Sequence, residues 1–250
     1  RLKDAASTAI YGARGANGVI LVTTKRPVEG RVVISLNTYV QTKELSNKLD
    51  VMDPYEFVLM QYENARQKSS NPTAFNNKYG HAYEHYIYQG NAGTDWQDEV
   101  FGSNPVAKYV DLSVNGGTEK TRYLASVNYM NQEGIVKNNG VSRFSARLNL
   151  DQELSEYVSF GLTATYSQNK YDNVPLGDNA NEYSGVLTGA IQSNPTIPIY
   201  DSEGNYFIDP KRPFVANPVS LLDIKDNTVK DRIIGSAFVS VKPLKDLEVK

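Results

Sequence analysis

The chain has 250 residues, a formal net charge of −2 and 22% charged residues, so it lacks the basic excess typical of nucleic-acid-binding proteins. It contains no cysteine, which excludes disulfides, zinc–thiolate sites and a cysteine nucleophile. No apolar run reaches the roughly 18 residues of a transmembrane helix, whereas a barrel strand needs only about 9–11 alternating residues.

The first residues predict a helix, a glycine-rich turn and a strand. Apolar residues at helical spacing precede Gly12, and glycine adopts the left-handed conformation that ends a helix at low cost. The β-branched run 19–24 predicts the strand. Glycines at every third residue, through Gly15 and Gly18, suggest a phosphate loop. Such a loop lies between a strand and a helix, in that order, so the reversed order here argues against a nucleotide site.

After a short linker at 27–30, six segments alternate between apolar and polar residues. In each segment one set of alternate positions is uncharged and mainly apolar, and the charged residues occupy the other set. This period is typical of a strand with one apolar and one polar face. The segments are 31–40, 109–115, 121–130, 142–151, 157–166 and 232–241.

The connections between these segments differ in length in a regular way. Those at 41–108 and 167–231 are long and that at 131–141 is of medium length, whereas those at 116–120, 152–156 and 242–246 are short. Outer-membrane barrels have short periplasmic turns and longer extracellular loops, and an ordinary sandwich has no reason to keep this parity. The pattern therefore favours a barrel wall whose two long connections are extracellular.

The long connections contain their own local signals. Asp53 as N-cap and Glu56 three residues later form a capping box, which predicts a helix over 54–67. A second short helix is expected near 183–193, and the residues of 201–205 favour a tight turn.

The N-terminal stretch STAIYGARGANGVILVTTK (7–25) resembles the end of the plug domain of TonB-dependent outer-membrane transporters. This version is similar to that of the SusC/RagA-type importers of Bacteroidota. The agreement continues downstream at spaced positions, which makes it more specific than any single motif. The further segments are LDVMDPYEF (49–57), TDWQDEVF (94–101), 112–137, ARLNLD (146–151) and NPTIPIYD (194–201).

The resemblance implies a mainly all-β fold. Residues 1–29 would form the C-terminal end of a plug domain. Residues 30–250 would form the first six or so strands of a large antiparallel transmembrane β-barrel of about 22 strands, so the chain is expected to be an internal part of a longer protein. Open strand edges in lipid require the remaining strands.

The resemblance also implies TonB-dependent import of an oligosaccharide or oligopeptide across the outer membrane. The expected partners are a SusD-like lipoprotein that covers the barrel, outer-membrane lipid, and the TonB–ExbB–ExbD complex, whose contact lies outside this chain. No enzymatic activity and no nucleic-acid partner are expected. A siderophore or cobalamin receptor is the nearest alternative, and a soluble β-sandwich that binds glycans is an alternative from another class.

The family resemblance assigns a structural and gating role to a plug motif. Within it, Arg14 is expected either to pair with a carboxylate of the barrel wall or to be solvated. The alternation of the strands places Arg122, Arg143 and Arg147 toward the lumen. The residues of the plug motif are Tyr11, Gly12, Arg14, Gly15, Asn17 and Gly18.

Aromatic residues gather in the first long connection. They are expected either to contact ligand or the lid lipoprotein, or to fill the interior of a compact loop, and the sequence favours neither. The residues concerned are Tyr83, Tyr86, Tyr88 and Trp96.

Two patterns suggest metals. His81 to His85 matches H-x-x-E-H, a zinc-peptidase motif, but Gly80 and Gly90 flank it closely, so a polar solvated loop is the favoured interpretation. Acidic residues in the loops offer oxygen ligands for calcium, but they match no EF-hand spacing, and solvated charge is favoured. No cofactor is expected. The acidic residues are Asp172, Asp178, Glu182, Asp223 and Asp226.

Overall fold

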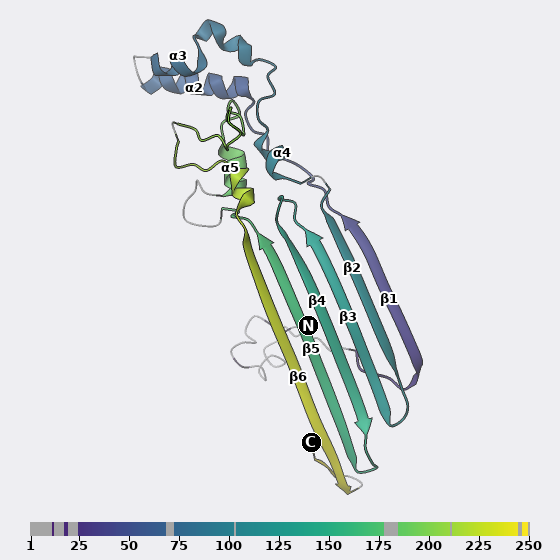
Figure 1. Ribbon diagram of the computed structural model, residues 1–250. Coiled ribbons are helices and arrows are strands. Elements are labelled where there is room, and N and C mark those ends of the chain that lie inside the picture. Colours follow the sequence, from purple (N-terminus) through teal and green to yellow (C-terminus); the bar gives the residue numbers. More distant parts are fainter. Residues whose placement is uncertain are drawn as a thin grey trace.

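A tall antiparallel sheet dominates the computed structural model, which describes residues 12, 18, 19, 25–68, 73–102, 104–177, 185–210, 212–244 and 247–249. Within these residues the sheet has seven strands, and each strand pairs with the next one in sequence (Figure 1). The strands are β1 Gly30–Thr42, β2 Val106–Gly117, β3 Thr121–Glu133, β4 Gly140–Glu153, β5 Val158–Asn173, β6 Asp226–Leu244 and β7 Leu247–Val249.

The six alternating segments correspond to β1–β6, but the strands are longer than the alternation predicts. Segment 157–166 extends to Asn173 in β5, and segment 232–241 begins already at Asp226 in β6. The added residues are mostly polar on both faces, so apolar alternation does not mark them. They remain strand because the hydrogen-bonded ladder continues, with Asn173 opposite Asp226.

The register brings the apolar positions of neighbouring strands into continuous rows on one face. Leu112 lies opposite Val127, and Val127 lies opposite Ala146. The row continues through Tyr166 to Ile233. Because neighbours on a strand point to opposite faces, a shift by one residue in any strand would break this row. The register thus matches the face assignment that the sequence predicts.

The apolar face is not covered by another layer of the described residues. Ile34, Leu36 and Ile233 are 68%, 64% and 79% exposed. A sandwich would pack a second sheet on this face at about 10 Å, so the soluble β-sandwich interpretation is wrong. An apolar face of this extent requires a non-aqueous environment, which a lipid-facing barrel wall has.

The long connections gather at one end of the sheet and carry its helices (Figure 1). The predicted capping box is confirmed: Asp53 Oδ1 accepts from the Glu56 backbone N–H at 2.7 Å, and Glu56 Oε2 accepts from that of Asp53 at 3.3 Å. Among the helices of the described residues, none is long and apolar enough to cross a membrane. They are α2 Pro54–Lys68, α3 Thr73–Tyr79, η2 Ala82–Tyr88, α4 Trp96–Val100, α5 Val186–Gln192 and η3 Ser220–Asp223.

The face assignment can be tested with adjacent residues of β3. Val127→Lys places a charge on the apolar face, which costs roughly 2–4 kcal/mol near the middle of a bilayer, whereas a lumenal lysine mainly changes the charge of the pore. We therefore expect Val127→Lys to lower the yield of assembled barrel in the full-length protein and Asn128→Lys to leave it nearly unchanged, as measured by heat-modifiable mobility on gels. In β4, Leu148→Lys and Arg147→Ala form a second pair. Failure of Asn128→Lys to assemble, together with normal assembly of Val127→Lys and Leu148→Lys, would show that the two faces are reversed.

Candidate functional site

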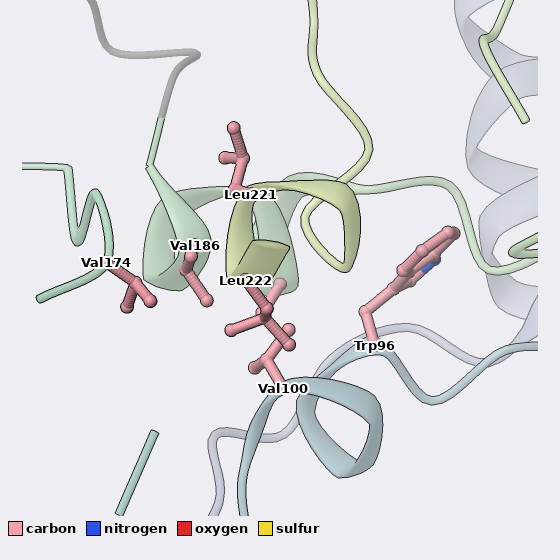
Figure 2. Close-up of a cluster of buried hydrophobic side chains, with 7 residues drawn as sticks. Trp96, Val100, Val174, Val186, Leu221 and Leu222 are labelled. Carbon is pink, nitrogen blue, oxygen red and sulfur yellow. The ribbon is translucent and has the colours of Figure 1, made fainter. Parts of the chain in front are cut away.

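The two long connections meet in one hydrophobic core beyond the end of the sheet, which we call the loop core. Figure 2 shows Val100 of the first connection beside Leu222 of the second, with Val186 and Trp96 of the same cluster on either side. The Trp96 ring is only 3% exposed, and its indole N–H donates to the backbone carbonyl of Asn194 at 3.0 Å. The structure therefore places Trp96 in packing, and its ring has no free face for a ligand.

The N-terminus of α4 is fixed by charged groups that flank Trp96. Asp95 Oδ1 caps the helix by accepting from the backbone N–H groups of Gln97 and Asp98, at 3.0 and 3.1 Å. Lys48 forms ion pairs with Asp95 and Asp98. Although burial opposes its ionisation, these hydrogen bonds hold the pKa of Asp95 below its usual value. The charged groups around Trp96 thus position the residues that pack between the two long connections.

The H-x-x-E-H stretch forms a helical turn, and its two imidazoles do not converge. His85 is 4% exposed and meets Tyr62 and Phe75 edge-on, with ring centroids 5.4 and 5.3 Å apart. His81 instead stacks on another ring, 5.4 Å away. Glu84 Oε2 accepts from the His81 backbone N–H at 2.6 Å, so its carboxylate caps the turn. This geometry does not form a zinc site.

The tyrosines of η2 divide into packed and exposed rings. Tyr88 is partly buried and meets Tyr79 edge-on at 6.5 Å between centroids, and burial raises the pKa of Tyr88. Tyr83 and Tyr86 are 74% and 69% exposed, and the adjacent Ile87 is 56% exposed. Of the three, Tyr88 is therefore packed, and Tyr83 and Tyr86 are open to solvent.

The acidic residues considered for calcium do not converge on a common point in the described residues, since Asp172 and Asp226 are neighbours across β5 and β6 but occupy opposite faces of the sheet. Asp172 lies in β5 and Asp226 in β6. Asp223 accepts a hydrogen bond from the Tyr206 hydroxyl at 2.6 Å, which raises the pKa of Tyr206 to about 12. The described parts of the chain contain no group of three or more acidic, histidine or cysteine residues able to hold a metal. The other two residues, Asp178 and Glu182, lie outside the described residues.

The predicted turn at 201–205 is present in the second connection. The backbone N–H of Asn205 donates to the side chain of Asp201 at 2.8 Å, and Gly204 has a φ of 86°. The Asn205 hydrogen bond holds the pKa of Asp201 below its usual value.

The polar face of the sheet carries the three arginines that the sequence assigns to the lumen. Arg122 pairs with Glu153 at 3.3 Å, and Arg147 Nε donates to Thr165 Oγ1 at 3.3 Å. Arg143 is exposed. The register places the three on one face, opposite the apolar rows.

The N-terminal segment contacts this polar face. Asn149 Nδ2 donates to the backbone carbonyl of Lys25 at 3.2 Å, and Asn149 is 5% exposed. In the plug motif, Gly12 and Gly18 have φ values of 60° and 90°, a conformation that favours glycine. The remaining plug-motif residues, Tyr11, Arg14, Gly15 and Asn17, lie outside the described residues, and so does the expected Arg14 ion pair.

Comparison with known proteins identifies relatives along the whole chain. No family model matches. TonB-dependent receptor P3 of Formosa agariphila is 32% identical over 100% of this chain and 23% of its own length. TonB-dependent receptor SusC of Bacteroides thetaiotaomicron is 31% identical over 82% of this chain and 18% of its own length. The chain thus spans about a quarter or less of the curated relatives that it matches.

Solved structures show the same fold. The RagAB peptide importer in its "open-open" state matches with a TM-score of 0.75 at 22% identity, over 99% of this chain and 30% of that chain. Its "closed-closed" state matches with a TM-score of 0.72. The sheet is therefore part of the wall of a large antiparallel transmembrane β-barrel. The chain belongs to the SusC/RagA family of TonB-dependent outer-membrane receptors.

The packing role of Trp96 can be tested by two substitutions. Trp96→Ala removes a buried ring and should destabilise the loop core by about 3–5 kcal/mol. Trp96→Phe retains most of the packing but leaves the Asn194 carbonyl without its donor, at a cost of about 1–3 kcal/mol. We expect proteinase K to cleave the surface loops of intact cells fastest in the alanine variant, with the barrel still assembled. Equal resistance of all three proteins would contradict the packing role.

Proposed function

We propose that the protein of which this chain is a part imports an oligomeric nutrient across the outer membrane at the expense of TonB-transmitted energy. The architecture of the sheet is the main support for this proposal. Its apolar face is exposed, its polar face is contacted by the N-terminal segment, and its long connections lie at one end. A wall with lipid on one face and a polar path on the other supports transport.

In this proposal the polar face lines the lumen, residues 1–29 end the plug, and the loop core lies at the cell surface. A TonB-dependent pull on the plug from the periplasm would open a path along the wall, which includes Arg122, Arg143 and Arg147. No covalent chemistry and no cofactor are required.

The proposed cargo is an oligosaccharide or an oligopeptide, held beneath a SusD-like lipoprotein. The relatives support this at the level of the family, since one is SusC and another is a peptide importer. Tyr83 and Tyr86 are proposed as contacts for the ligand or the lid because their rings are exposed on the first long connection. A siderophore or cobalamin is the alternative cargo.

The orientation can be checked with single cysteines in the cysteine-free chain. Ser202 and Thr118 are both exposed, in a long connection and in a short turn at the opposite end of the sheet. An impermeant thiol reagent on intact cells should label Ser202→Cys and should not label Thr118→Cys. The reverse pattern would invert the topology.

Import itself is tested by uptake of labelled oligomers in cells with and without a functional TonB. Uptake that requires both this protein and TonB supports the proposal, because passive diffusion through a plugged barrel is blocked. A matched strain that lacks the proposed SusD-like lipoprotein tests the lid. Equal uptake without TonB would exclude active import.

A further inference from the structure

Three basic side chains lie together on the polar face of the sheet, near the end that carries the loops. Arg143 of β4 is opposite Asn169 of β5, and Asn169 is opposite Lys230 of β6. With about 4.8 Å between strands, the backbones of Arg143 and Lys230 are roughly 10 Å apart. Arg232 lies two residues along β6 on the same face, about 7 Å away. We call these three residues the basic cluster.

The basic cluster has no carboxylate partner among the described residues. None of its members takes part in the ion pairs there, whereas Arg122 on the same face pairs with Glu153. Lys230 Nζ lies 5.3 Å from the centroid of the Tyr171 ring, a cation–π contact with an uncharged partner. Strand spacing places the backbone of Asp111, a carboxylate on this face, about 12 Å from that of Arg143.

The basic cluster also lies closer to the loops than the point at which the N-terminal segment contacts the sheet. Lys25 meets β4 at Asn149, and both Asn149 and its opposite neighbour Leu124 are buried, at 5% and 9% exposure. Arg143 is six residues further toward the loops, a rise of about 20 Å along the strand. On this central strand Arg143 is exposed, so its charge faces the space between that contact and the loops.

Aromatic rings share the row of the basic cluster. Tyr39 and Tyr109 stack with centroids 4.7 Å apart and planes at 14°. Tyr109 is opposite Met130, which is opposite Arg143. Flat aromatic faces suit the apolar faces of sugar rings, and unpaired guanidinium and ammonium groups suit carboxylate or sulfate.

We infer that the cargo is an acidic oligosaccharide, carrying carboxylate or sulfate groups, and that the basic cluster attracts and binds those groups in the outer part of the path. The inference rests on the proposed function and adds the charge of the substrate to it. Clustered charge at a wall of low dielectric raises the local concentration of an oppositely charged ligand. The stacked tyrosines orient the sugar rings beside the cations.

The test uses the purified full-length protein in detergent and calorimetric titration with sulfated and unsulfated dextran oligosaccharides of equal length. We expect the sulfated form to bind more tightly, with an affinity that falls as salt rises. The triple variant Arg143→Gln, Lys230→Gln, Arg232→Gln should weaken its binding by at least about tenfold. Arg143→Lys alone should retain most of the affinity, because it keeps the charge. Lys242→Gln, on the same face of β6 at its other end, is the matched control and should change the affinity less than about twofold.

Equal binding of both dextrans, no binding of either, or an unchanged affinity in the triple variant would overturn the inference. If the triple variant bound sulfated dextran with unchanged affinity but made the outer membrane leaky, the basic cluster would serve to hold the plug in place and the inference would be wrong. Tighter binding of tetraglutamate than of sulfated dextran would make the cargo an acidic peptide. Because binding is measured without TonB, tight binding together with TonB-independent uptake would count against the proposed function alone.

Discussion

The hydrogen-bonded ladder between strands is the constraint on which the rest of the structure depends. In lipid, an unpaired backbone N–H or carbonyl costs several kcal/mol, so a membrane-spanning sheet must pair every strand. Here β2–β6 each pair on both sides with their neighbours in sequence. That pairing fixes the register, and the register decides which side chains lie on the apolar face and which lie on the polar face of the wall. The basic cluster exists only because three neighbouring strands hold this register.

The sequence predicted the features that depend on local periodicity. Alternation located β1–β6, and the capping residues Asp53 and Glu56 located the start of α2. It did not predict the polar ends of β5 and β6, because residues such as Asn173 carry no apolar alternation and are strand only through their cross-strand partners. It also left the aromatic residues of the first connection undecided.

Long-range packing explains what the sequence left undecided at the candidate site. Trp96 is buried through contacts with residues nearly a hundred positions away in the chain, such as Asn194, and no short-range pattern encodes that distance. Tyr83, in a similar aromatic context, is exposed. That Arg122, Arg143 and Arg147 share one face was easier to predict, because strand parity alone assigns the face. Their grouping with Lys230 required the register across β4, β5 and β6.

The shared core of Trp96, Val100, Val186 and Leu222 has a mechanical consequence. Residues from both long connections bury the same apolar surface, so displacing one connection alone would expose part of that core to water, at about 25 cal/mol for each Å². The two connections therefore hold each other in place. The β3–β4 connection is bonded to the same core, because Asn138 Nδ2 donates to the backbone carbonyl of Leu222 at 3.0 Å. The two long connections thus form one cohesive unit in place of two independent flaps.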